Sequence, residues 1–145
     1  VYNNYWVLIF SYPENSHTED YRQEVLDLVN AQRAKYGLTA LEMGNDALTA
    51  AAQTRAEEIA VVNSHTRPDG SKCFTVLKDY GVTDTPTGEN AAWGSVSPEE
   101  VVNAWMNSEG HRANILNPEA RKMSVGYYYN SASTWGHQWI QIFTK

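Results

Sequence analysis

Three short motifs place ionisable side chains where the chain is expected to turn. His65 lies in the sequence Ser-His-Thr-Arg-Pro-Asp-Gly, Glu89 in Gly-Glu-Asn, and His111 in Gly-His-Arg-Ala-Asn-Ile-Leu. Two imidazoles and one carboxylate can hold a divalent metal ion or transfer protons. Their spacing along the chain does not show whether they converge, so the residues alone leave chemical and structural roles open.

Each motif also has a purely structural explanation. The sequence Arg-Pro-Asp-Gly after His65 is typical of a turn in which Asp69 accepts hydrogen bonds from backbone amides. Glu89 could be a buried hydrogen-bond acceptor that fixes a glycine-flanked bend. We expect Asn90 to have such a structural role, and Asn114 could hold the loop of His111 in the same way.

The composition is that of a single globular domain without a nucleic-acid partner. The chain has 145 residues, of which 42% are hydrophobic and 19% charged. A net charge of −6, with no cluster of Lys and Arg, opposes binding to DNA or RNA. No apolar run approaches the length of a membrane-spanning helix. Because the chain begins at Val1, we interpret it as a mature form or a fragment.

The remaining cysteine and histidines are expected to be structural or solvated. Cys73 is the only cysteine, so no intramolecular disulfide can form. No motif near it would activate a thiolate, and we expect a buried thiol that packs as a small apolar side chain. His17 and His137 favour surface positions, although His137 could reach the site.

The elements that must position the motifs can be predicted from capping residues and apolar spacing. A capping box at residues 16–19 begins a helix that ends at Gly37. A second helix, with an alanine-rich stripe that includes Arg55, runs from Asn45 or Asp46 to about residue 63. Short helices are expected at residues 74–80, from residue 98, and near residues 108–116.

Two strands are expected at the C-terminal end of the chain. Apolar and polar residues alternate at residues 125–129 and 139–143, with a polar loop at residues 130–136 between them. At most two of the three tyrosines at 127–129 should face the core. Helices followed by an antiparallel pair indicate an α+β domain in which helices pack on a small sheet.

The three motifs, in this order, resemble those of the CAP superfamily: cysteine-rich secretory proteins, antigen 5 and pathogenesis-related proteins. They resemble in particular its disulfide-free bacterial branch, from about residue 22 to residue 143. The resemblance implies an α-β-α sandwich, with a small antiparallel sheet between helical layers and a large open cleft. We therefore predict one such domain at residues 18–145, and an N-terminal arm or linker at residues 1–17.

The resemblance also implies a ligand cleft. His65, Glu89 and His111 match cleft positions that coordinate a divalent cation, often zinc, in several relatives. Asn90 and Asn114 belong to the same motifs and are expected in the same cleft. A divalent metal such as zinc is therefore one cofactor that this site could take.

One position departs from the pattern of many eukaryotic relatives. These have a further glutamate three residues after a helix tryptophan, which corresponds here to Trp105. The position three residues later is Ser108, and the neighbouring Glu109 is out of register. The missing acid argues against tight metal binding.

Three functions remain open, and the first is preferred. It is a binding module for an extracellular peptide, glycan or lipid, with a metal assisting or not. The second is a metal-dependent hydrolase or peptidase, in which His65 and His111 hold a zinc-bound water and Glu89 acts as ligand or base. The third is a structural or adhesive domain. The chain contains neither a Gly-x-Ser-x-Gly nor a His-Glu-x-x-His motif.

The resemblance and the absence of disulfides favour secretion by a Gram-positive bacterium. If the site converges, the carboxylate of Glu89 should raise the pKa values of both His65 and His111 in the metal-free protein. Metal binding would then weaken in acid.

Overall fold

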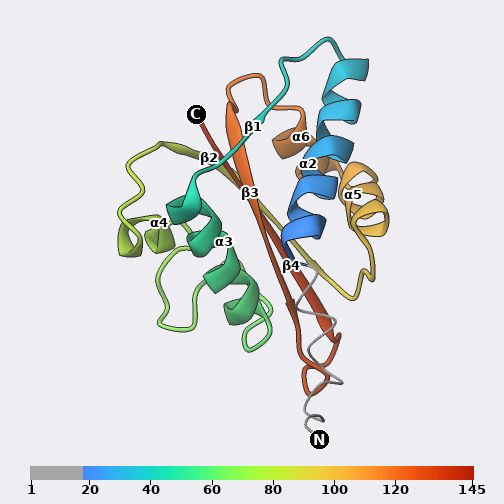
Figure 1. Ribbon diagram of the computed structural model, residues 1–145. Helices are drawn as coiled ribbons and strands as arrows, with labels where there is room; N and C mark the ends of the chain where they lie inside the picture. Colours follow the sequence, from blue (N-terminus) through green and yellow to red (C-terminus); the bar gives the residue numbers. More distant parts are fainter. Residues whose placement is uncertain (1–17) are drawn as a thin grey trace, which may run out of the picture.

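The computed structural model describes residues 18–145, and the predicted capping box and N-terminal arm lie largely or wholly outside this range. The described chain contains helices α2 (Thr18–Lys35), α3 (Asp46–Ile59), α4 (Thr75–Asp79), α5 (Pro98–Met106) and α6 (Glu109–Ile115). Its strands are β1 (Glu42–Met43), β2 (Pro86–Trp93), β3 (Lys122–Tyr129) and β4 (His137–Thr144) (Figure 1).

The strands form one four-stranded sheet in the order β1-β3-β4-β2. The predicted hairpin, β3 and β4, is its centre, and β2 pairs antiparallel with β4. The short β1 runs parallel to β3, so the sheet is mixed rather than wholly antiparallel. The prediction of a bend at residues 88–90 was wrong, because these residues lie within β2. Their polar side chains gave no alternating pattern, although the strand is buried through its middle.

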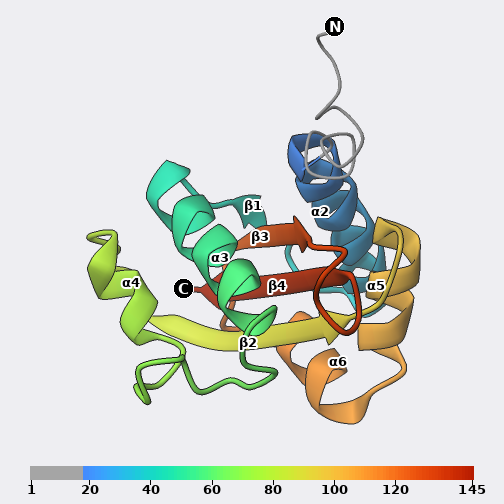
Figure 2. The ribbon, with the colours of Figure 1, turned by 90° about the horizontal axis from the view of Figure 1, so that it is seen from below.

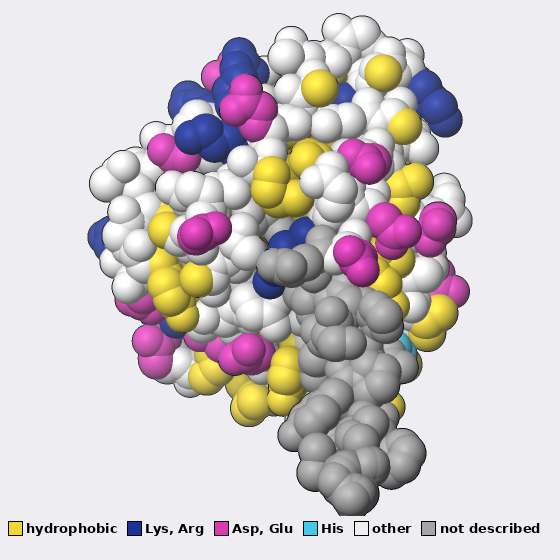
Figure 3. Space-filling model, viewed as in Figure 1, with side chains coloured by type: hydrophobic (Ala, Val, Ile, Leu, Met, Phe, Trp, Pro, Cys, Tyr) yellow, Lys and Arg dark blue, Asp and Glu magenta, His cyan; other side chains and the backbone are white. Residues whose placement is uncertain are grey.

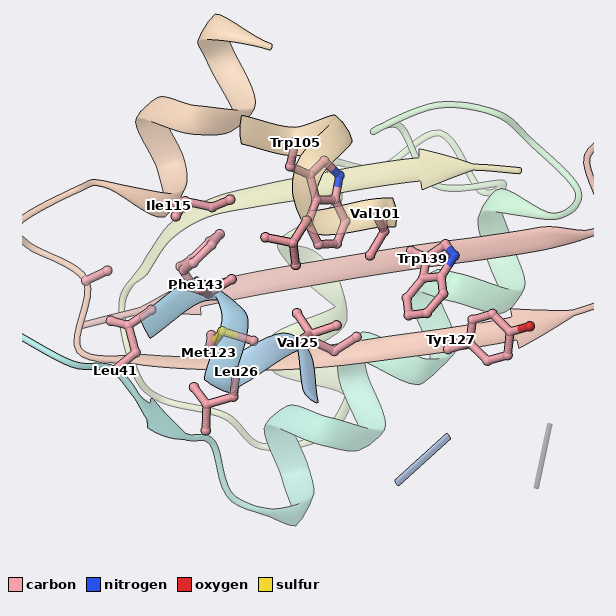
Figure 4. Packing of buried hydrophobic residues seen from close by; sticks show 14 residues of the cluster. Val25, Leu26, Leu41, Val101, Trp105, Ile115, Met123, Tyr127, Trp139 and Phe143 are labelled. Atoms are coloured by element: carbon pink, nitrogen blue, oxygen red, sulfur yellow. The ribbon is translucent and has the colours of Figure 1, made fainter. Parts of the chain in front are cut away.

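Helices cover both faces of this sheet. In Figures 1 and 2, α3 and α4 lie on one side, and α2 and α5 lie on the other. Every second side chain of β3 points toward α2 and α5, namely those of Met123, Val125 and Tyr127. Together with Trp105 and Trp139, they form part of the larger core (Figure 4). The α+β sandwich predicted from the sequence is confirmed.

The second core lies between the sheet and α3. Ile140 and Ile142 of β4 point into it, opposite to their neighbours on the strand. Because this face is covered too, Tyr128 packs on the second core and is half-buried rather than exposed. All three tyrosines at 127–129 therefore contribute to packing, one more than predicted.

Small residues bring α3 against β3. Ala51, Ala52 and Ala56 are fully buried on the helix. A Cβ atom at Gly126 would lie 2.1 Å from the carbonyl oxygen of Ala52, so the strand and the helix touch through their backbones. The predicted role of the alanine stripe is confirmed, and its neighbour is the glycine of β3.

The predicted helix boundaries hold where capping residues mark them. Asn45 accepts a hydrogen bond from the backbone N–H of Leu48 at the start of α3, and Ser97 accepts one from Glu100 at the start of α5. Gly37 and Gly81, both with φ +71°, close α2 and α4. Helix α3 ends at Ile59, four residues earlier than expected, and leads into the loop that carries His65.

Candidate functional site

The centre of the site is the carboxylate of Glu89 on β2, whose side chain is only 2% exposed. The guanidinium of Arg55, from α3, donates two hydrogen bonds to it, from Nε to Oε2 (2.9 Å) and from Nη2 to Oε1 (3.1 Å). Nδ1 of His65 lies 2.7 Å from Oε1 of the same carboxylate. Arg55, Glu89 and His65 thus form a continuous chain of contacts, which we call the Arg55–Glu89–His65 site.

Arg55 belongs to the alanine-rich stripe of α3, and the folded helix buries this stripe. The position of Arg55 in the interior follows from that burial. The side chain has no solvent exposure. Besides Glu89, it donates to Oε1 of Glu58 (2.9 Å) and to the backbone carbonyl of Ser64 (3.0 Å). The bond to Ser64 anchors the residue that precedes His65. Sequence reasoning placed Arg55 on the buried stripe but missed its role; an arginine among alanines was the available signal.

A second arginine holds the rest of the His65 loop. Arg67 donates to both carboxylate oxygens of Glu58 and to Oδ2 of Asp79 on α4 (2.9 Å). Glu58 therefore bridges Arg55 and Arg67. The turn after Arg67 forms as predicted, with Asp69 accepting from the backbone N–H of Ser71 (2.9 Å).

His111 comes to the site on α6, which the two asparagines fasten to β2. Nδ2 of Asn90 donates to the backbone carbonyl of His111 (3.1 Å), and Nδ2 of Asn114 donates to Oδ1 of Asn90 (2.8 Å). Nδ2 of Asn90 also donates to Oε1 of Gln141 on β4 (3.1 Å). Asn90 is fully buried. Both asparagines therefore make the structural contacts predicted for them, and Asn114 stays partly exposed on α6.

Two further residues fix the position of α6. A Cβ atom at Gly88 would lie 2.5 Å from Oδ1 of Asn114, so only glycine admits that side chain beside β2. At the other end of the helix, the buried Arg33 of α2 donates to the carbonyls of Ile115 (2.8 Å) and Asn117 (3.0 Å). Nothing in the sequence pointed to this use of Arg33.

The pKa values of the two histidines are shifted in opposite directions. The hydrogen bond to Glu89 raises the pKa of His65 above its ordinary value of 6.5, and burial offsets this only in part. Burial lowers the pKa of His111, and the positive charge of His65 lowers it further. The prediction that Glu89 raises both values was therefore wrong for His111, whose imidazole is half-buried and feels its neighbour's charge.

The carboxylate of Glu89 stays ionised although it is buried. Burial alone would raise its pKa, but hydrogen bonds from His65 and Arg55, with their positive charges, hold that pKa below 4.5. Neighbouring Cys73 is buried, as predicted, and burial beside Glu89 raises the pKa of its thiol to about 11. Cys73 is therefore a thiol rather than a nucleophilic thiolate at neutral pH.

An NMR titration of the histidine ring protons should separate the two imidazoles. We expect the pKa of His65 above 6.5 and that of His111 below it. Replacing Glu89 with Gln should lower the pKa of His65, and replacing His65 with Ala should raise that of His111. Glu119→Gln is the charge-matched control, because Glu119 is exposed and contacts neither histidine. Identical titrations of both histidines would contradict the described contacts.

The same shifts fix how each histidine affects stability. A raised folded pKa means that the contribution of His65 is complete below pH 6.5 and is lost as the pH rises through the folded value. His111 acts in the opposite direction, because its lowered pKa penalises protonation as the pH falls below 6.5.

The three-ligand metal set predicted from the resemblance does not fit this arrangement. Among residues 18–145, no group of three or more His, Cys, Asp or Glu side chains is arranged to hold a metal ion. Glu89 is engaged by Arg55 and by Nδ1 of His65, and the guanidinium charge opposes a cation beside it. Nε2 of His65 and the imidazole of His111 are the nitrogens left for a ligand. Glu89 instead contacts Nδ1 of His65 and fixes the orientation of its imidazole.

The structure also shows the surroundings of His137 and Ser108, the two other residues considered for the site. His137, at the start of β4, lies beside the hydroxyl of Tyr127 (2.7 Å) and pairs with Tyr129 at the end of β3. Glu89 pairs with Ile142, near the other end of β4. His137 is therefore separated from the site by most of the strand. Ser108 occupies the N-cap position of α6 but makes no capping hydrogen bond through its side chain.

The side chain of His65 is 55% exposed, whereas His111 is half-buried. Three grooves of about 510, 570 and 210 Å³ lie elsewhere on the described surface. The first lies between α2 and α5, the second beside α4, and the third near β1. Within residues 18–145, no helix is long and apolar enough to span a bilayer.

Comparison with known proteins identifies relatives for nearly the whole described chain. The model of the cysteine-rich secretory protein family, CAP, matches residues 26–143. The uncharacterized protein YkwD of Bacillus subtilis strain 168 is 40% identical over 127 residues, which cover 86% of this chain and 49% of YkwD. The chain thus spans about half the length of that relative.

Two solved structures share the fold. An extracellular protein containing an SCP domain from Bacillus anthracis superposes with a TM-score of 0.77 at 25% identity, over 88% of this chain and 41% of that one. An outer surface protein from Borrelia burgdorferi gives a TM-score of 0.68 at 26% identity, over 83% of this chain and 88% of that one.

Proposed function

Because the chain belongs to the cysteine-rich secretory protein (CAP) family, as a member of bacterial type, we propose that it is a binding module and not a hydrolase. Its ligand would be met outside the cell of a Gram-positive bacterium. The descriptions of two structural neighbours as extracellular and outer surface proteins support this location, and the relatives from Bacillus support the host.

One observation carries the proposal: the carboxylate of Glu89 is fully engaged. A general base must be free to accept a proton from water or substrate. Here Arg55 and His65 hold both carboxylate oxygens, and they keep the pKa of Glu89 below 4.5. Such a carboxylate is a poor base at neutral pH, but it is well suited to fixing an imidazole in one orientation.

The exposed part of the site is then a pair of imidazoles. His65 presents its Nε2 edge from a loop pinned by Arg55 and Arg67, and His111 presents its ring from a helix pinned by Asn90. A side chain that is already held in place loses little conformational freedom when a ligand binds. The pair can donate and accept hydrogen bonds at neutral pH, since the pKa of His111 lies below its ordinary value.

Among residues 18–145, a divalent metal at this site would have these two imidazoles as its protein ligands. Closed structural zinc sites use four protein ligands, and catalytic ones use three. We therefore propose that a metal such as zinc can assist this module but is not required by it. Binding measured with EDTA and with added zinc chloride should differ little.

Cosedimentation with isolated Gram-positive cell envelopes tests the proposal. We expect saturable binding of the wild-type protein, and a loss of at least about fivefold in affinity when His65 and His111 are both replaced by Ala. The variant Glu119→Gln/Lys145→Gln, which removes an exposed ion pair, is the surface control. The thermal unfolding of each variant shows whether the fold is intact.

Two results would overturn the proposal. Release of soluble peptide or sugar fragments that stops in the double-histidine variant would establish a hydrolase instead. Envelope binding that is unchanged in the same variant would leave the histidines without a part in recognition, and would favour a structural or adhesive domain.

A further inference from the structure

Three segments meet at the end of the sheet where β2 stops and β4 begins. The indole Nε1 of Trp93 donates to the carbonyl of Ile59 (3.0 Å), which ties the end of α3 to β2. The backbone N–H of Gly94 donates to the carbonyl of His137 (2.8 Å), which ties β2 to the β3–β4 hairpin. Figure 1 shows the three loops side by side at the lower end of the molecule. We call residues 59–64, 92–98 and 129–136 the uncharged end.

This end contains no Lys, Arg, Asp or Glu. The stretch without charged residues is long, because residues 123–144 contain no Lys, Arg, Asp or Glu, although 19% of all residues are charged. Each of the three segments instead exposes an apolar side chain: Val61 is 78% exposed, and Val96 and Trp135 are each 55% exposed. In Figure 3, hydrophobic side chains lie along the visible lower edge, with acidic side chains beside and above them. Exposed apolar side chains concentrated in one region often mark a binding surface.

Trp135 is presented by a loop that is already ordered. The hydroxyl of Ser133 donates to the carbonyl of Asn130 (2.7 Å) and accepts from the backbone N–H of Gly136 (3.1 Å). Gly136 has φ +73°, a backbone conformation that favours glycine. Because the loop is held by its own hydrogen bonds, the indole can meet a ligand with little loss of conformational freedom.

The exposed polar side chains of the uncharged end are neutral. Asn63, Ser131 and Thr134 are exposed and carry amide or hydroxyl groups. A ligand matched to this surface has no net charge, offers hydroxyl or amide partners, and has an apolar face for the indole. The rings of neutral sugars fit, because their C–H faces stack on the electron-rich face of an aromatic ring and their hydroxyls hydrogen bond to neutral side chains.

A membrane surface fits less well. Attachment to anionic lipid relies on Lys and Arg near the bilayer, and the uncharged end has neither, in a chain of net charge −6. A charged peptide would find no counter-charge here. The charge pattern therefore favours an uncharged glycan.

We infer that the uncharged end binds a neutral glycan, with Trp135 as the stacking platform. The loop that carries Val61 also carries His65, so this surface adjoins the Arg55–Glu89–His65 site. The inference rests on the proposed binding function, and it names the chemical class of the ligand.

Isothermal titration of the full chain with hexa-N-acetylchitohexaose tests the inference, because this oligosaccharide is uncharged and offers both pyranose faces and amides. Saturable binding is expected, and Trp135→Ala should weaken it about tenfold, as for the loss of an aromatic anchor. Trp135→Phe should recover part of the loss, because stacking remains. Tyr36→Ala is the matched control, since Tyr36 is 60% exposed after the end of α2. Thermal unfolding should be the same for all variants.

Absence of a saturable signal at millimolar oligosaccharide would overturn the inference, and so would binding that Trp135→Ala leaves unchanged. Cosedimentation with phosphatidylcholine vesicles that depends on Trp135, without oligosaccharide binding, would assign this end to a membrane surface instead. If the histidine-dependent binding to cell envelopes persists while oligosaccharide binding fails, the proposed function stands and this inference alone is lost.

Discussion

Replacing Arg55 with Met is expected to destabilise the folded protein by about 3–5 kcal/mol, because it leaves a buried charge without its partner. The carboxylate of Glu89 would keep only His65, and the carbonyl of Ser64 would lose its donor. Urea unfolding at pH 7 measures the difference in the free energy of unfolding.

The destabilisation should depend on pH with a definite sign. In the wild-type protein the pKa of Glu89 lies below its ordinary value of 4.5, so its contribution to stability is present above that pH and is lost as the pH falls through the folded value. Without Arg55, burial dominates and raises this pKa. The difference between variant and wild type should therefore shrink in acid, where the carboxylate is protonated.

A double variant shows whether the lost charge pair is the cause. Arg55→Met combined with Glu89→Leu removes both charges and should recover much of the stability, since replacing a buried pair by apolar residues is often close to neutral. If the double variant is as unstable as the sum of the single variants, the two side chains do not interact in the way described. Equal stability of Arg55→Met and wild type would contradict the site outright.

Gly126→Ala should destabilise the protein by about 3 kcal/mol, at the upper end of the usual range for overpacking. The added Cβ would lie 2.1 Å from the carbonyl oxygen of Ala52, and a backbone atom cannot rotate away as a side chain can. Helix α3 would have to move off the sheet. For a domain of this size the melting temperature should fall by roughly 6–12 °C.

Gly110→Ala is the matched control for this substitution. No atom lies within 4 Å of a Cβ at Gly110, its φ is not positive, and the residue lies within α6. Alanine should therefore leave stability unchanged or raise it by about 0.5–1 kcal/mol. If both substitutions had the same effect, close contact between α3 and β3 would not be what Gly126 provides.

Gly126→Ala should also reach the site, because α3 carries Arg55. A shift of the helix would lengthen the contacts between Arg55 and Glu89, and the pKa of His65 should move as well. The histidine titration described above can detect this in the folded variant. A change in stability without any change in the pKa of His65 would mean that strand β3 moves and helix α3 does not.

The local elements of this protein could largely be predicted from its sequence. Capping residues and glycines marked the starts and ends of helices, because they satisfy backbone groups that a helix leaves unpaired. Alternation marked β3 and β4, since one face of each strand meets the aromatic core. The family could be recognised from three ordered motifs, and those motifs located His65, Glu89 and His111.

The partners of those side chains were decided only by the tertiary structure. Strand β2 gave no pattern, because Glu89 and Asn90 are polar and yet buried, each satisfied by groups far away in the chain. The sequence shows that Arg55 lies on a buried stripe, but it does not show which carboxylate the guanidinium meets. The sign of the pKa shift at His111 likewise depends on burial and on the distance to His65, and neither is a local property. Local hydrogen bonding fixes the elements, whereas the chemistry of the site follows from charges that only packing brings together.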